Sequence, residues 1–122
     1  MARANEDFGR TFLNKGVRGI AMKLVLLKRI SKGEIYSYAL LKEIDQKSGF
    51  FGHLRRHGVG IKNDIYNTMK ALEKSGYIRM DARIDNGRLK KYYSITKSGK
   101  DVLKQTRRIL TSSMQSLMEI TR

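Results

Sequence analysis

The chain has 122 residues, of which 40% are apolar, and this size and composition fit one folded domain around one hydrophobic core. It carries 26 Lys and Arg against 11 Asp and Glu, a net charge of +15 that is spread over both halves of the chain and attracts polyanions, nucleic acid above all. The absence of cysteine excludes a disulfide framework, and the short apolar runs exclude a membrane span, so we expect a cytoplasmic protein.

Three helices are predicted in the first part of the chain, after a polar arm at residues 1–16. Apolar residues at positions 17, 20, 21, 24, 25, 27 and 30 form a broad helical stripe that is typical of a largely buried helix. A shorter helix follows, with Tyr38, Leu41 and Ile44 flanked by Leu40 and with Ser37 as its cap.

The third helix is predicted over about 62–75. Ile65, Met69 and Leu72 repeat at helical spacing, so we expect them to face the core. Ser75-Gly76 ends this helix, because glycine tolerates the left-handed conformation that closes many helices. The opposite side then presents polar and basic side chains, namely Lys62, Asn63, Tyr66, Asn67 and Lys70.

The segment 48–60 reads as a loop, because it contains four glycines. His53 and His57 are four residues apart and could share a metal ion if they were helical. No cysteine or neighbouring acid supports such a site, so we predict no metal and no cofactor, and instead a basic or solvated loop.

Residues 77–95 predict a β-hairpin. Ile78, Met80, Ala82 and Ile84 alternate along one strand, and the Asn86-Gly87 pair favours a type I′ turn. The returning strand carries adjacent tyrosines at 92 and 93, which must point to opposite faces of the sheet, so one of them is expected in the core.

The last helix is predicted to begin after Thr96, which suits an N-cap. Its apolar positions are Leu103, Leu110, Met114 and Leu117, and the sevenfold spacing of the leucines is typical of a coiled-coil seam. A helix of about 24 residues is about 36 Å long, which exceeds one side of so small a domain. We therefore expect a second copy of the chain to cover part of the seam, the alternative being a helix that folds back on its own core.

Three helices, a hairpin and a final helix make a mainly α, α+β arrangement, the winged helix-turn-helix plan with a long C-terminal dimerisation helix. The predicted organisation is an arm at 1–16, a winged helix domain at 17–95 and a dimerisation helix at 96–122.

Three motifs carry a family resemblance. Residues 65–78, IYNTMKALEKSGYI, resemble the recognition helix of the PadR-like transcription regulators, I-Y-P-x-L-x-x-L-E-x-x-G-L-I. Residues 85–99, DNGRLKKYYSITKSG, are similar to the wing of that family, G-R-x-x-K-Y-Y-x-I-T-x-x-G. Residues 36–41, YSYALL, resemble its Y-G-Y-E-L, and the similarity spans about residues 17–104.

The sequence departs from these motifs at three positions: Asn67 and Ser37 stand where the family usually has Pro and Gly, and Leu89 stands where its wing has Pro or Arg. The resemblance implies a nucleoid-associated repressor of a prokaryote that binds double-stranded DNA as a homodimer. It also implies pairing through the last helix, with help from the N-terminal one, and for some members a small aromatic effector at the dimer interface.

The winged helix plan places one helix in the major groove and the wing on the backbone or minor groove. Asn can pair with adenine and Lys with guanine or phosphate. We predict base contacts at the third helix and backbone contacts from that helix and the wing at about 84–91. The base-contact residues are Asn63, Tyr66 and Asn67, with a phosphate or core role as the alternatives for Tyr66. The backbone-contact residues are Lys62, Lys70, Arg83, Arg88, Lys90 and Lys91.

Three other functions are less well supported by the sequence. An enzyme is disfavoured, because the sequence has no glycine-rich phosphate loop, no cysteine nucleophile and no G-x-S-x-G elbow. A sequence-tolerant DNA-coating or chromatin-like protein is the better rival, because charge alone gives nonspecific binding. RNA binding is weaker, since readers of single strands expose stacked aromatic side chains on a sheet.

Overall fold

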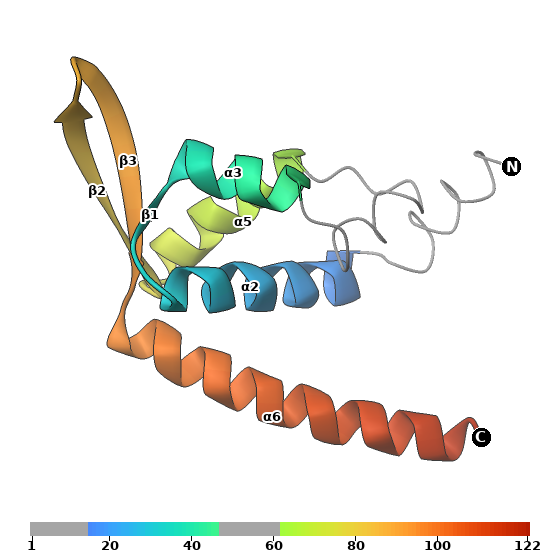
Figure 1. Ribbon diagram of the computed structural model, residues 1–122. Helices are drawn as coiled ribbons and strands as arrows, with labels where there is room; N and C mark the ends of the chain where they lie inside the picture. The colour runs from blue at the N-terminus through green and yellow to red at the C-terminus, as the bar shows by residue number, and fades with distance from the viewer. Residues whose placement is uncertain (1–14, 47–61) are drawn as a thin grey trace, which may run out of the picture.

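The computed structural model describes residues 15–46 and 62–122, and in these ranges four helices pack around a small antiparallel sheet (Figure 1). The elements in chain order are α2 (Lys15–Ser31), β1 (Ile35–Tyr36), α3 (Ser37–Gln46), α5 (Lys62–Lys74), β2 (Ile78–Asp85), β3 (Arg88–Ile95) and α6 (Lys97–Ile120). The predicted fold class, mainly α with a small β component, is confirmed. The arm before residue 15 and the predicted 48–60 loop lie outside the described residues.

The core lies between α2, α3, α5 and the base of the sheet. Its buried side chains are Met22, Leu26, Leu27, Ile30, Ile35, Leu40, Ile44, Ile65, Met69, Leu72, Ile78 and Tyr93. The inward side of α5 is therefore the predicted one.

The buried face of α2 differs from the predicted stripe. Met22 and Leu26, which the stripe omitted, are almost completely buried, whereas Ile20, which it included, is 44% exposed. A helix this rich in apolar residues offers several possible inward faces. Contact with α5, α6 and β3 decides which of them is buried.

The inward face of α3 also differs from the prediction. Leu40 and Ile44 are buried, while Tyr38 is 63% exposed. Tyr38 lies in the first turn of α3, two residues before Leu40, so the helical repeat that buries Leu40 and Ile44 turns Tyr38 away from the core.

The C-terminus of α5 closes as the Ser75-Gly76 pair predicts. Gly76 has φ of 79°, and its N–H donates to the carbonyl of Glu73 at 3.0 Å. The N–H of Tyr77 reaches back to the carbonyl of Leu72 at 2.9 Å. These two bonds are those of a Schellman motif, and they turn the chain directly into β2.

The hairpin is confirmed, including its turn. Asn86 and Gly87 have φ of 53° and 75°, the positive values that a type I′ turn requires, and Asp85 pairs with Arg88 across it. The predicted two-stranded sheet is wrong in one respect: β1 adds a third strand, pairing Ile35 with Tyr93 and Tyr36 with Tyr92 in the order β1-β3-β2. Two residues are too few to show a period, so the sequence alone did not reveal this strand.

Helix α6 begins at the predicted N-cap. The Thr96 hydroxyl accepts from the N–H of Gly99 at 3.0 Å and donates to the carbonyl of Gly76 at 2.7 Å. Gly99 is buried, and a Cβ there would lie 2.0 Å from the carbonyl oxygen of Tyr77. From this close contact α6 runs along α2, and its C-terminal half extends away from the body (Figure 1).

Candidate nucleic-acid interface

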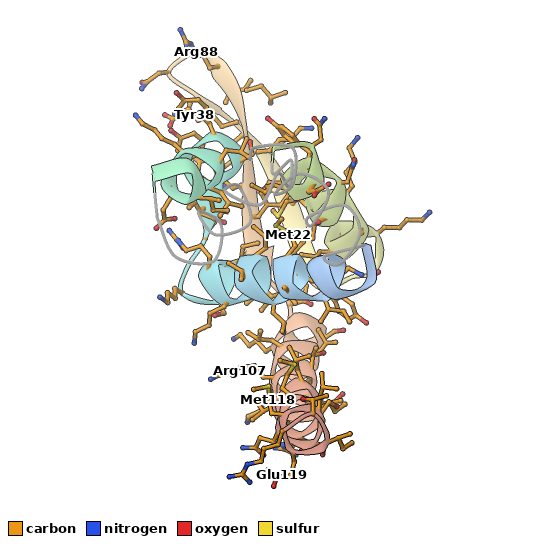
Figure 2. All side chains as sticks on the ribbon, turned by 90° about the vertical axis from the view of Figure 1, so that its right-hand side faces the viewer. Met22, Tyr38, Arg88, Arg107, Met118 and Glu119 are labelled. Carbon is orange, nitrogen blue, oxygen red and sulfur yellow. The ribbon has the colours of Figure 1, made fainter. Side chains whose placement is uncertain are left out.

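A groove of about 1210 Å³ lies between α5, the start of α3 and the β2–β3 hairpin, which we call the wing. Tyr66 and Lys70 of α5 line it together with Arg88, Lys90 and Lys91 of the wing. We call it the wing groove. Figure 2 shows Arg88 and Tyr38 at one end of the molecule and Arg107, Met118 and Glu119 at the opposite end. The polar face of α5 and the cationic wing therefore share one surface.

The exposed side of α5 carries the residues that the sequence placed there. Asn63, Asn67 and Lys70 are exposed, and Tyr66 is 45% exposed, so Tyr66 is not a core tyrosine. The side chain of Lys62 lies outside the described residues. Because Ile65, Met69 and Leu72 turn inward, this side of α5 does not pack against the core. Four polar or aromatic groups thus point away from the core along two turns.

The cations of the wing divide between its two faces. Cross-strand pairing places Arg83 opposite Lys90 and Asp85 opposite Arg88 on one face, whereas Lys91 lies on the face that continues from the core. Arg88 follows the turn and is exposed, as is Lys91. Neither of these two side chains forms an ion pair within the described ranges.

Arg83 is exposed but is held by intramolecular contacts. Its guanidinium donates to both carboxylate oxygens of Glu34 at 2.7 Å and to Asp81 at 2.8 Å, and it lies 4.4 Å from the centre of the Tyr92 ring. The hydrogen bonds to Glu34, and then those to Asp81, raise the pKa of Arg83 above its ordinary value. The side chain joins the wing to the residue before β1.

Lys90 is held less tightly. Its ammonium lies 3.2 Å from Asp85 and 4.8 Å from the centre of the Tyr36 ring. The hydrogen bond that Lys90 donates to Asp85 raises the pKa of Lys90. Lys90 therefore stays charged and remains beside the wing groove, which it also lines.

Three tyrosines beside these cations were not singled out as site residues from the sequence. The Tyr36 ring lies 5.8 Å from that of Tyr92 and stacks at 6.4 Å on that of Tyr38. Tyr36 and Tyr38 also line the wing groove. The signal was present in the Tyr-Ser-Tyr motif at 36–38, but the periodic pattern assigned Tyr38 to the core.

Tyr93, which follows Tyr92 in β3, points into the core. One of these two adjacent tyrosines was expected there from the sequence. It is 9% exposed, at the floor of the wing groove. Burial raises the pKa of the Tyr93 hydroxyl, and the charge of Glu73 and the neighbouring Tyr66 act in the same direction. The ring supports the groove and stays neutral near neutral pH.

The residues predicted for dimerisation follow one side of α6 but differ in exposure. Leu103 packs against the protomer's own core, and Leu110 is half-buried. Met114 and Leu117 are 50% and 52% exposed, and all residues from 111 onward are exposed. The apolar stripe thus begins against the body and continues past it.

A second basic hollow lies between α2 and α6, far from the wing tip. Its cations are Lys28, Lys100, Lys104, Arg107 and Arg108, with Asp101 as the one acidic residue among its lining. Within the described residues, basic side chains thus gather both at the wing, which carries Arg88, and at this second hollow, which contains Arg107 (Figure 2).

The described ranges contain no cluster of His, Cys, Asp and Glu able to hold a metal ion. His53 and His57 lie outside these ranges. Within the same ranges, no helix is long and apolar enough to cross a membrane.

Comparison with known proteins matches residues 26–105 to the transcriptional regulator PadR-like family. No curated protein matches the chain. Among solved structures, a PadR family transcriptional regulator from Eggerthella lenta has a TM-score of 0.73 at 22% identity and covers 99% of this chain and 98% of its own. A Streptococcus transcriptional regulator has a TM-score of 0.69 at 24% identity over 88% and 98% of the two chains.

A third structure, a PadR family regulator from Clostridium difficile, has a TM-score of 0.58 at 22% identity and covers 80% of this chain and 97% of its own. These likenesses confirm the fold along almost the whole length of the solved proteins. The family match spans the end of α2, then α3, α5, the wing and the start of α6, and it includes α3, α5 and the wing, which line the groove. The chain belongs to the PadR-like family of transcriptional regulators.

Proposed function

We propose that this regulator acts as a homodimeric repressor that binds specific double-stranded DNA. Helix α5, with the predicted range 62–75, enters the major groove. The wing, at about 84–91, contacts the backbone or the neighbouring minor groove. This is how winged helix proteins dock on a duplex.

One observation carries the proposal: a single groove is lined by both α5 and the wing. The apolar side of α5 is buried and its polar side is exposed. The wing adds the exposed Arg88 and Lys91 to the same surface. Both elements can therefore contact one duplex at once. The carboxylates nearest the wing, Glu34, Asp81 and Asp85, are paired with Arg83 and Lys90, and so do not form an acidic cover over Arg88.

The two kinds of contact are assigned by chemistry. Asn63 and Asn67 can each present an amide to an adenine edge, and the exposed Tyr66 lies between them on the same side of α5. Backbone contacts fall to Lys62, Lys70, Arg88, Lys90 and Lys91. Arg83 also remains among the proposed backbone contacts. We expect it to contribute least to DNA binding, because its guanidinium is already bound to Glu34 and Asp81.

Pairing of two copies through α6 completes the proposal. Leu110, Met114 and Leu117 continue the stripe that Leu103 begins, and the exposed part has no cover within the described residues. Two protomers related by a two-fold axis would present two α5 helices to half-sites about 34–36 Å apart or a multiple of that spacing. A small aromatic effector at this interface stays a prediction of the family resemblance.

Selection of bound duplexes from a random pool tests the function. A specific regulator enriches one palindromic sequence and binds it roughly 10³-fold or more tightly than random duplex at the same salt concentration. Enrichment of no sequence, with an affinity ratio near one, would support the DNA-coating alternative instead. Repression is then tested by placing the recovered sequence over a reporter promoter.

Two substitutions separate base reading from backbone contact. Asn67→Ala should lower affinity for the recovered sequence more than for random duplex, by about 1–3 kcal/mol at its base pair. Arg88→Ala should weaken both to a similar extent and reduce the steepness of the salt dependence by about one contact. Lys23→Ala is the matched control, because Lys23 is an exposed cation of α2 that does not line the wing groove, and it should change the salt dependence little.

A further inference from the structure

Two large apolar side chains lie at the tip of the wing. Phosphate binding does not require them, because phosphate is bound by cationic and hydrogen-bonding groups. Ile84 is 79% exposed and Leu89 is 68% exposed. They are direct cross-strand partners beside the Asn86-Gly87 turn. We call them the apolar tip pair.

The apolar tip pair is not an extension of the hydrophobic core. It shares a sheet face with Met80 and Tyr93, but Ala82 and Lys91, both exposed, separate it from them. Cross-strand partners of this type do stabilise a hairpin, but a pair of threonines would do so too without exposing aliphatic surface to water. The pair is therefore available for a partner.

The surroundings of the apolar tip pair select the partner. Lys91 lies on the same sheet face as the apolar tip pair, whereas Arg88 and Lys90 lie on the opposite face, so a polyanion that reaches the tip meets cations on both faces of the wing. Leu89 also lines the wing groove, together with Tyr66 and Lys70 of α5. A duplex bound to α5 thus receives the tip from the side, with its phosphates opposite the cations and its apolar interior opposite Leu89.

We propose that the apolar tip pair inserts into the minor groove as a wedge, partly unstacks one base step and bends the duplex. Aliphatic side chains that enter a minor groove act in this way in proteins that bend DNA. The inference rests on the proposed function and adds a mode of readout. Because flexible pyrimidine–purine steps are easily unstacked, the wing would favour such a step at its contact point without hydrogen-bonding to its bases.

The test uses the duplex recovered from the random pool. Its bend is measured by fluorescence energy transfer between its ends, and unstacking by 2-aminopurine placed in turn at each step flanking the α5 contact. The wild-type chain should bend the duplex and raise the 2-aminopurine signal at one step in each half-site. The double variant Ile84→Thr/Leu89→Thr should lose both signals and about tenfold in affinity, with an unchanged salt dependence.

Three controls accompany this test. Threonine pairs well across strands, so thermal unfolding should show that the variant hairpin still folds. The double variant Ile84→Val/Leu89→Met retains apolar tips and should keep the bend and the unstacking signal. Arg88→Ala should weaken binding and flatten the salt dependence, while the bound fraction still shows the bend.

Three outcomes would overturn the wedge. Wild-type chain that binds the selected duplex without bending or unstacking it would refute the wedge and leave the proposed function standing. The same holds if the threonine variant bends DNA as the wild type does. Failure to bind any duplex, or binding to anionic vesicles in its place, would refute the proposed function and the wedge together.

Discussion

Gly99 shows how one residue positions a whole helix. The Thr96 hydroxyl bridges the α5 end and the α6 start, and the backbone of Tyr77 passes directly over Gly99. The I-T-x-x-G part of the wing motif therefore forms the junction between the wing domain and α6.

This contact predicts opposite effects for the same chemical change at two glycines. Gly99→Ala should lower the free energy of unfolding by about 2–3 kcal/mol, because its Cβ would lie against backbone that must shift. Gly19→Ala is the control within α2, where nothing lies within 4 Å of the new Cβ. It should raise stability by about 0.5–1 kcal/mol through helix propensity. Denaturant unfolding of both variants measures the two signs; equal effects would contradict the junction.

Tyr93 makes the fold sensitive to alkaline pH. Its pKa is raised in the folded chain, chiefly by burial, so the unfolded chain releases the proton first as pH rises. The stabilisation is complete below the ordinary tyrosine pKa of about 10 and is lost as pH rises through the folded value. Tyr93→Phe should show a smaller loss of unfolding free energy across this range in pH-dependent denaturation. An unchanged alkaline profile in the variant would show that other groups cause the loss.

At the scale of elements, α6 has two halves with different tasks. Its first turns bury Gly99 and pack Val102 and Leu103 against the body, and residues after 110 have no cover within the described chain. The first half stabilises the protomer. We expect the second half to stabilise the dimer.

A pair of lysine substitutions tests this division. Leu117→Lys should raise the dimer dissociation constant by more than about tenfold, because it puts a charge into an apolar seam. Gln115→Lys adds the same charge two residues away, on the other side of α6, and should change it little. Sedimentation equilibrium measures both. Thermal melts of dilute protomer should match, since both residues are exposed.

The wing is stiffened by interactions that join it to β1. Arg83 lies across the Tyr92 ring to reach Glu34, and Lys90 lies over Tyr36. A hairpin of eight-residue strands that projects from the body would otherwise depend on its own ladder. These contacts fix the wing to β1, and a wing in a fixed position is what the proposed contact of α5 and the wing with one duplex requires.

At the scale of the whole molecule, the charge of +15 acts differently on its two interfaces. In the proposed complex the wing groove meets phosphate, so salt should weaken binding there. The α2–α6 hollow, with five cations, lies beside the proposed dimer seam, so two copies that pair there should repel each other. Salt should therefore loosen DNA binding and tighten the dimer.

This predicts two opposite salt dependences in one protein. Between about 50 and 200 mM salt, affinity for the selected duplex should fall by roughly 10³-fold, while the dimer dissociation constant without DNA should fall by roughly two- to fivefold. The variant Arg107→Gln/Arg108→Gln should dimerise more tightly at low salt and lose most of the second effect. A dimer that weakens with salt would mean that ion pairs, not apolar contacts, hold it together.

The sequence alone determined the elements whose signals are local. Helical spacing set the inward side of α5, the Asn-Gly pair set the turn and register of the wing, and Ser75-Gly76 and Thr96 set two helix ends. Each of these follows from the preferences of a few consecutive residues, so no tertiary information was needed.

Only the tertiary structure decided the features that depend on distant partners. Strand β1 exists because Ile35 and Tyr36 pair with residues 58 and 56 positions later. Arg83 is bound by Glu34, 49 residues away, and α2 buries Met22 and Leu26 because of what packs against it. Local periodicity says that a face is apolar or a residue is charged. Which residues pack against that face or pair with that charge depends on the tertiary fold, which brings residues that are distant in sequence into contact.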